Sequence, residues 1–334
     1  MVDTEVQLRY SLFKSRLKFM KNLQEHLTPM QKHIQPLNMN GLSGRMLKLP
    51  KNKSSLSKNR EILLVYGHHT SLERMYGIAE SLSEFGNVTM PDLPGCGGME
   101  SFYKLGMKPN LDTMADYVAS FIKLRYRGKK ITIISMSLGF AIVTRMLQRY
   151  PEICDKVDLL ISVVGFSHRY DFIFSKYRKF SYLAMASFFS HKLPATFFYN
   201  VFLHPTVIKT SYSKTHNAKK KLANLNPEDK KKAIDFEVDL WRQDDTRTYM
   251  AMAVQFLTID NCKKQIPLPV HHISVAGDQY FDHSVVEQHM RVIFTDFTEH
   301  EAVIPNHAPS ILATKKEADP FIPKSVKKLL RSVS

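Results

Sequence analysis

The sequence contains few cysteines, and their spacing indicates neither a crosslinked domain nor a metal site. Three cysteines, Cys96, Cys154 and Cys262, occur in 334 residues, and no two of them form a CxxC pair. This excludes a disulfide framework and a zinc site of the usual kind. Cys96 follows a predicted strand but lacks a strand-to-helix turn, so we do not expect it to be a nucleophile. We expect reduced thiols, no metal and no cofactor.

Long apolar runs and targeting patterns are also missing. No stretch reaches the roughly 18 uninterrupted apolar residues of a transmembrane helix. Near the N-terminus, Arg9, Lys14, Arg16 and Lys18 interrupt the apolar residues, which argues against a signal peptide. The sequence predicts a cytoplasmic protein.

Acidic residues are scarce relative to basic ones. The net charge is +16, and residues 1–60 contain twelve Lys or Arg against three Asp or Glu. Anionic lipid, nucleic acid or solvated helix faces would each account for this excess. We favour solvated faces, with peripheral contact to an anionic membrane as the alternative. No zinc finger or RNP-type aromatic pair is present, so we expect no nucleic-acid partner.

The most informative segment is a serine between a predicted strand and a predicted helix. A β-branched run at 130–134 precedes Ser135-Met136-Ser137-Leu138-Gly139, and a helical pattern follows at 140–147. A nucleophile on such a tight turn needs small residues two positions before and after it. Ser135 and Gly139 meet this need, although the usual first residue is glycine. The segment predicts that Ser137 is a nucleophile.

Four further strand ends carry polar or glycine-rich loops in a consistent order. Strands predicted at 61–66 and 88–90 end in Gly67-His68-His69-Thr70 and in Asp92-Leu93-Pro94-Gly95-Cys96-Gly97. Strands at 271–276 and 301–305 end in Gly277-Asp278 and in Asn306-His307-Ala308-Pro309. The sequence over about residues 60–334 therefore resembles the α/β-hydrolase superfamily, whose triads run Ser, Asp, His along the chain.

The resemblance implies an α/β fold with a doubly wound, mostly parallel sheet and an inserted helical cap. We expect a basic N-terminal segment at 1–58, which includes an amphipathic stretch from Val6 to Phe19 and a strand at 44–50. The hydrolase core would comprise 59–167 and 263–334. Residues 168–262 are rich in aromatics and would form the helical cap, with its aromatics facing substrate or packing together.

The resemblance also assigns roles at the site. Ser137 would attack a carbonyl carbon, with His307 as its base and Asp278 as the acid that orients the imidazole. Asp282 is the alternative acid, or otherwise the N-cap of a helix at 284–290, and Asp171 is the third choice. The backbone amides of His68 and Leu138 would form the oxyanion hole. Tyr66 stands where relatives often have histidine, and Asp92 is expected to organise its loop.

A serine nucleophile argues against the dehalogenases and epoxide hydrolases of this fold, which use aspartate. We expect a carboxylesterase that cleaves an apolar ester through an acyl-enzyme intermediate. Acyl transfer and C–C bond hydrolysis would use the same residues and remain alternatives. A non-catalytic binding protein of the same fold is a further alternative, but it would have no chemical reason to keep all three side chains.

Overall fold

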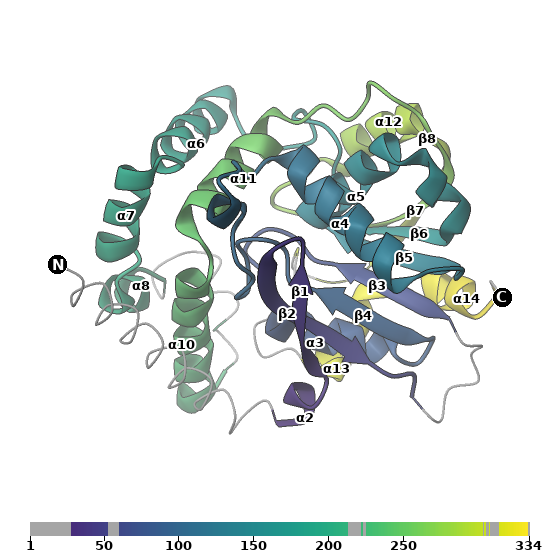
Figure 1. Cartoon of the computed structure of the whole chain (residues 1–334), viewed down its shortest axis with the longest axis horizontal. Coiled ribbons are helices and arrows are strands. Elements are labelled where there is room, and N and C mark those ends of the chain that lie inside the picture. Colours follow the sequence, from purple (N-terminus) through teal and green to yellow (C-terminus); the bar gives the residue numbers. More distant parts are fainter. Residues whose placement is uncertain are drawn as a thin grey trace.

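The computed structural model describes residues 28–52, 60–212, 222, 225–302, 304, 307 and 314–332. Its centre is an eight-stranded sheet with the order β1-β2-β4-β3-β5-β6-β7-β8 (Figure 1). The predicted amphipathic stretch from Val6 to Phe19 lies outside the described residues. No described helix is both long and apolar enough to cross a bilayer.

The first two strands form an antiparallel hairpin, and the six that follow in the sequence are parallel to one another. β2 pairs antiparallel with both β1 and β4, while β3 to β8 are joined by parallel pairings. The sheet is therefore mostly parallel, as predicted. The strands are β1 (Ile34–Met39), β2 (Leu42–Leu49), β3 (Glu61–Val65), β4 (Asn87–Pro91), β5 (Ile131–Met136), β6 (Val157–Val163), β7 (Ile266–Val275) and β8 (Phe294–Ala302).

Helices cover both faces of this sheet. Because both faces of the central strands are buried, these strands are mostly apolar along their length. All six residues of β5 are buried. Helices α4 (Leu111–Arg125) and α5 (Leu138–Arg149) pack together in front of the sheet in Figure 1. Helix α3 (Leu72–Leu82) lies behind it with α13 (Lys315–Ala318), the 3₁₀ turn η3 (Asp319–Phe321) and α14 (Lys324–Ser332).

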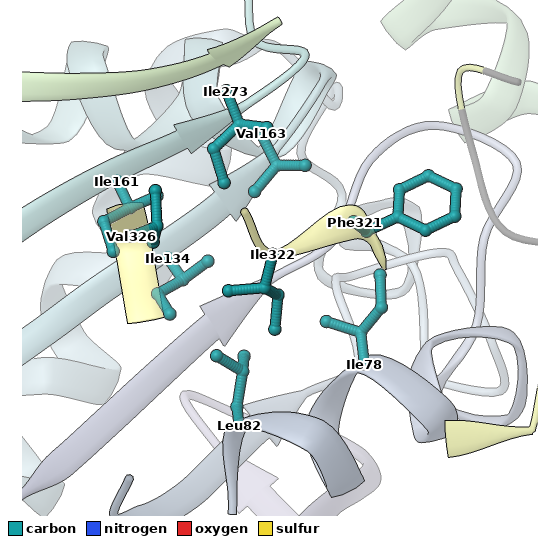
Figure 2. Close-up of a pocket in the computed structure, with 9 residues that line it drawn as sticks. All are labelled: Ile78, Leu82, Ile134, Ile161, Val163, Ile273, Phe321, Ile322 and Val326. Carbon is teal, nitrogen blue, oxygen red and sulfur yellow. The ribbon is translucent and has the colours of Figure 1, made fainter. Parts of the chain in front are cut away.

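A small apolar cavity marks the contact between the sheet and these rear helices (Figure 2). Ile134, Ile161 and Ile273 approach it from three neighbouring strands, and Leu82 and Ile322 approach it from the opposite side. The side chains around it are all aliphatic or aromatic, so apolar burial stabilises this part of the layer. The cavity belongs to the core and is not part of a polar site.

Two helix starts follow the capping signals in the sequence. The Asn110 side chain accepts a hydrogen bond from the Thr113 amide, and the Thr113 hydroxyl accepts one from the Asn110 amide. The two bonds form a capping box at the start of α4. Asn226 caps α10 (Pro227–Gln243), and Pro227 occupies its first turn. In the sequence, Asn110 before an apolar helical pattern and the segment Pro227-Glu228-Asp229 predict these two helix starts, and both are confirmed.

The prediction was wrong at the last strand. It placed a strand at 301–305, whereas β8 runs from Phe294 to Ala302. β8 is the edge strand of the sheet and pairs only with β7. Most of its side chains are exposed, with Phe294, Phe297 and Ala302 as its buried residues. An edge strand of this kind shows no apolar run, so the sequence pattern did not reveal it.

Among the described residues, five helices are inserted between β6 and β7: α6 (Lys176–Phe189), α7 (Lys192–Val201), α8 (Pro205–Tyr212), α10 and α11 (Thr246–Thr258). They lie beside the sheet, with α11 and α10 nearest to it and α6 and α7 at the outer edge of the molecule (Figure 1). α11 packs against α6 and α7, and α10 packs against α8. We call these five the inserted helices.

A buried polar junction joins the inserted helices to the loop after β4. The Gly97 amide donates to Asp244 Oδ1 at 3.0 Å, and the Asp245 amide donates to the Gly95 carbonyl at 2.8 Å. Asp244 is 4% exposed, and this burial raises the pKa of its carboxyl to about 8. The neighbouring charges of Asp92 and Asp245 raise it further, against the opposing effect of the Gly97 hydrogen bond.

This raised pKa predicts a pH-dependent stability. In the unfolded chain an aspartate loses its proton near pH 4, whereas folded Asp244 keeps its proton to about pH 8. Between these values the folded state binds one more proton, so stability falls as pH rises. Asp244→Asn should remove this contribution and flatten the decline in melting temperature between pH 5 and pH 8.

The matched control is Asp245→Asn, because Asp245 caps α11 by accepting from the Thr248 amide at 2.7 Å. Asparagine also accepts at a helix N-cap, so this variant should keep the cap and a melting temperature close to that of the wild type, without flattening the pH profile. Thermal unfolding followed by circular dichroism at both pH values measures this. A wild-type profile in Asp244→Asn would contradict the prediction.

Candidate active site

Ser137 occupies a strained turn between β5 and α5. Its backbone has φ +50° and ψ −120°, in a region that non-glycine residues rarely adopt and that costs about 1–3 kcal/mol. The Ser137 amide donates to the Val163 carbonyl at 3.0 Å, and the Phe140 amide donates to the Ser137 carbonyl at 3.0 Å. These bonds to β6 and α5 hold the strained residue at the C-terminal ends of the strands.

Close approach of the neighbouring chain explains the small residues around this turn. A Cβ at Gly139 would lie 2.4 Å from the Tyr66 carbonyl oxygen and 2.5 Å from that of Val65. A Cβ at Gly67 would lie 2.9 Å from the Ser137 Cβ. Ser135 is fully buried in β5. Only small residues therefore allow α5 to start directly beside the end of β3.

The structure brings the side chains of Ser137, His307 and Asp278 together, with His307 between the other two. His307 Nε2 lies 3.3 Å from Ser137 Oγ, and His307 Nδ1 lies 2.8 Å from Asp278 Oδ2. The three residues follow different strands of the sheet, separated by 170 and 29 positions in the sequence. Their side chains have the nucleophile–base–acid geometry of a Ser-His-Asp triad.

Asp278 is held as a carboxylate at one end of this group of side chains. Its side chain is 1% exposed, and burial alone would raise its pKa. Hydrogen bonds from His283 and His307, the charge of His307, and the Tyr280 amide at 2.8 Å outweigh burial. Together they hold the pKa of Asp278 well below its usual range, so the carboxylate keeps its negative charge beside His307.

The two alternative acids have other partners. Asp282 caps α12 (His283–Ile293): its Oδ1 accepts from the Ser284 amide at 3.1 Å and from the Ser284 hydroxyl at 2.5 Å. This is the capping role that the sequence offered as an explanation. Asp171 is fully buried and lies 2.5 Å from His289 Nδ1. The structure thus brings neither carboxylate to His307.

A second histidine contacts Asp278 and was missed in the sequence analysis. His283 Nε2 lies 3.4 Å from Asp278 Oδ2, and His283 Nδ1 lies 3.2 Å from His272 Nε2. His272 Nδ1 is in turn 2.9 Å from Ser162 Oγ. Burial lowers the pKa of His272 to about 3, so this histidine is neutral. Ser162 and His272 are opposite each other in the β6–β7 register, which the sequence alone does not reveal.

The loop after β3 lies beside Ser137 and carries one of the expected oxyanion donors. Gly67 packs closely against Ser137, and His68 follows Gly67 in the sequence. The other expected donor, the Leu138 amide, belongs to the first residue of α5, where helix amides have no acceptor within the helix. Their role as oxyanion donors stays a prediction, which requires both N–H groups to point toward the same developing negative charge.

Side chains of this loop connect it to the inserted helices. His68 Nε2 lies 3.1 Å from the Tyr249 carbonyl of α11, and burial lowers the pKa of His68 to about 3. His69 Nε2 lies 3.0 Å from Glu237 Oε2 of α10, and the His69 ring is 4.3 Å from that of Trp241. The imidazole rings of the loop therefore serve structural contacts rather than the reaction.

Tyr66, which replaces the histidine common in relatives, has a clear structural role. Its hydroxyl donates to Asp92 Oδ1 at 2.9 Å and accepts from the Leu93 amide at 2.8 Å. Asp92 is fully buried and also accepts from Arg45 Nε at 3.0 Å. The expectation that Asp92 organises its loop is confirmed, and Tyr66 is its partner.

Aromatic rings surround His307 on the side of the inserted helices. The rings of Tyr280 and Phe281 lie 5.0 and 5.2 Å from that of His307. Phe281 stacks on Phe166 at 4.8 Å, and Phe172 contacts both Phe281 and Phe256. These rings give the site an apolar wall.

The aromatics of the inserted region agree with the expectation only in part. We expected those between Phe172 and Phe202 to face substrate or to form the core of a cap. Phe189, Phe198 and Tyr199 do pack into small clusters with α8, α10 and α11, although none of the aromatics in this interval is fully buried. Phe172 and Phe174 lie in the aromatic wall, whereas Tyr177, Phe180 and Phe197 point to solvent. Helical periodicity alone could not tell an inner apolar face from an outer one.

Two hollows of the structure lie away from Ser137 and His307. The apolar cavity of Figure 2 lies in the core, and an open surface hollow borders Tyr103, Lys108, His191 and Arg247. Neither includes Ser137 or His307 among its walls. Among the described residues no three His, Cys, Asp or Glu side chains are grouped so as to hold a metal ion. Burial raises the pKa of Cys96 well above its usual value, so this thiol stays protonated.

The similarity of this chain to known proteins lies in its structure. No family model and no curated protein matches the sequence. An esterase from Thermogutta terrifontis is 15% identical with a TM-score of 0.56, covering 90% of this chain and 99% of that one. An enol-lactonase from Burkholderia xenovorans is 12% identical with a TM-score of 0.58, covering 89% and 98%.

The epoxide hydrolase CorEH is 13% identical with a TM-score of 0.59, covering 89% of this chain and 96% of that one. The three similar structures differ in the reactions that their names state, but they share the arrangement of sheet and helices. Their similarity to this chain extends over most of its length. The chain therefore has the fold of the α/β-hydrolase superfamily.

Proposed function

We propose that the protein is a serine hydrolase that cleaves a carboxylic ester. The observation that carries this proposal is the line from Ser137 Oγ through His307 to Asp278, with distances of 3.3 and 2.8 Å. A serine hydroxyl is a weak nucleophile unless a base accepts its proton, and His307 is placed to do so. Catalytic hydrogen bonds are often longer in the absence of substrate, which suits the 3.3 Å distance.

The reaction would proceed in two halves. Ser137 Oγ attacks the ester carbonyl while His307 Nε2 takes the hydroxyl proton, and the amides of His68 and Leu138 stabilise the oxyanion. His307 then gives the proton to the leaving alcohol, which leaves an acyl group on Ser137. Water attacks this acyl-enzyme with His307 again as base, and the carboxylic acid departs. Asp278 holds the imidazole in position and stabilises its cation throughout.

The surroundings of His307 support an apolar acyl group. Tyr280 and Phe281 lie against the imidazole, and Phe166, Phe172 and Phe256 extend the same wall. Binding sites for small molecules are typically apolar with a few placed polar groups. Acyl transfer to another alcohol would use the same residues with an alcohol in place of water, and C–C bond hydrolysis would use them as well.

The proposed mechanism predicts the effect of replacing each of the three catalytic residues. Ser137→Ala or His307→Ala should lower kcat/KM for p-nitrophenyl butyrate by about a thousandfold or more, since triad members act together. Ser137→Ala should also abolish covalent labelling by a fluorophosphonate probe. Asp278→Asn should lose most of the activity as well, because it no longer stabilises the imidazolium.

Asp282→Asn is the matched control, since Asp282 caps α12 instead of facing His307. It should keep most of the activity. Equal damage from both aspartate variants would contradict the assignment of the acid. A wild-type protein that neither reacts with the probe nor hydrolyses esters would show a hydrolase-like binding protein instead.

The second prediction concerns substrate polarity. Activity should rise from acetyl to butyryl and hexanoyl esters, by up to about fourfold per added CH₂, because each buried CH₂ contributes about 0.8 kcal/mol. Phe172→Ala should reduce this gain, since Phe172 belongs to the aromatic wall. Steady-state kinetics on a p-nitrophenyl ester series measure both effects. A preference for charged or sugar esters would contradict the apolar wall as an acyl site.

A further inference from the structure

The exposed apolar side chains of this protein gather on one part of the inserted helices. Of the sixteen exposed large hydrophobic side chains among the described residues, twelve lie between Tyr170 and Val207. Tyr177 is 88% exposed, Leu193 81% and Phe180 72%. Single exposed apolar residues are common on any protein, but a concentration of this kind on one pair of helices marks an interaction surface.

These side chains follow the helical repeat. On α6, Tyr177, Phe180 and Phe188 recur at helical spacing, and on α7 the exposed residues are Leu193, Phe197 and Val201, four positions apart. We call these six side chains the outer face. Helices α6 and α7 form the margin of the molecule farthest from the sheet, so the outer face is not covered by the hydrolase core (Figure 1).

The same two helices already use another face for internal packing. Ala186 of α6 is buried with Met250 and Ala253 of α11, and Phe189 and Phe198 pack against this cluster. Leu203, after α7, is buried with Val238 of α10. A helix that is apolar on both its inner and its outer side indicates a second apolar environment besides the core. The proposed acyl site does not supply this environment, because no ring contact among the described residues joins the outer face to the aromatic wall beside His307.

Charge identifies the second environment. The sequence contains no Asp or Glu from residue 172 to residue 227, and nine Lys or Arg occur in that interval. Among them, Lys176 and Lys192 begin α6 and α7, and neither contacts a carboxylate among the described residues. A second copy of the chain on this face would bring like charges together. Anionic headgroups above an apolar layer match both the charge and the apolar side chains.

We propose that the outer face of α6 and α7 docks onto the surface of an anionic lipid bilayer. The apolar side chains enter the headgroup–acyl boundary, and Lys176 and Lys192 contact lipid phosphates. This placement assigns membrane contact to the inserted helices rather than to the basic segment at 1–58. The proposal rests on exposure and charge, so it holds independently of the catalytic assignment.

Vesicle flotation of the full chain tests this proposal. The wild-type protein should float with vesicles of phosphatidylcholine and phosphatidylglycerol at equal amounts, and far less with phosphatidylcholine alone. Phe180→Ser combined with Leu193→Ser should weaken binding about tenfold or more, since two inserted apolar side chains are removed. Lys176→Glu combined with Lys192→Glu should reduce the preference for phosphatidylglycerol.

Leu124→Ser combined with Val292→Ser is the matched control. These side chains are 53% and 48% exposed and lie on helices α4 and α12, outside the outer face. This variant should bind vesicles like the wild type. Because every replaced side chain is exposed, circular dichroism should show unchanged folding and melting temperatures in all the variants. Fluorophosphonate labelling in solution should also be unchanged, which separates docking from catalysis.

Three results would overturn the proposal. The first is wild-type vesicle binding by the Phe180→Ser, Leu193→Ser variant. The second is loss of vesicle binding on deletion of residues 1–20 while the Phe180→Ser, Leu193→Ser variant still binds fully. That result would place the contact in the N-terminal segment. The third is a wild-type dimer in light scattering that the variant converts to a monomer, without vesicle binding by either. In that case a second copy would cover the outer face.

Discussion

The turn at Ser137 depends on how closely α5 approaches the end of β3. Gly139 stands against the carbonyl oxygens of Val65 and Tyr66, and Gly67 stands against Ser137 itself. Because no side chain separates these segments, α5 can begin at Leu138 and the backbone of Ser137 can be held at positive φ. The other groups of the site lie around this contact. The loop from Gly67 to His69 and the histidine after β8 both converge on the side chain that it presents.

The apolar runs of the sequence were sufficient to predict the centre of the sheet. β3, β5 and β6 are buried on both sides and therefore consist almost entirely of apolar residues. The order of Ser137, Asp278 and His307 at successive strand ends could be read in the same way, because parallel strands end at one edge. The edge strand β8 was misplaced, since an exposed strand has no such run. Local patterns predict an element only where burial dictates its composition.

Contacts between distant segments could not be predicted. Tyr66 meets Asp92 only because β3 and β4 are neighbours in the sheet, and His272 meets Ser162 only because of the β6–β7 register. The direction of the aromatics on α6 and α7 depends on which side of each helix meets α11. Sequence periodicity shows that a helix has an apolar face but does not show what covers it.

Buried polar groups, as well as apolar and ring contacts, join the inserted helices to the site. Glu237 of α10 is 2% exposed and lies 3.0 Å from His69 and 3.6 Å from Arg74. Asp244 contacts the loop after β4 in a similar way. A displacement of α10 would leave a buried carboxylate without these partners, at a substantial energetic cost. The position of the inserted helices and the conformation of the loop at Gly67 are therefore coupled.

The histidines behind Asp278 give this carboxylate a directional hydrogen-bond chain. His283 Nε2 lies 3.4 Å from both Asp278 Oδ2 and the nitrogen of the Val275 amide, whose N–H can only donate. A neutral His283 with its hydrogen on Nε2 donates to the carboxylate. In that tautomer His283 Nδ1 accepts from His272, and His272 Nδ1 accepts from the Ser162 hydroxyl. On the other side His307 donates to the same carboxylate. Hydrogens on both sides thus point toward Asp278, and one tautomer choice at His283 orders all the groups behind it.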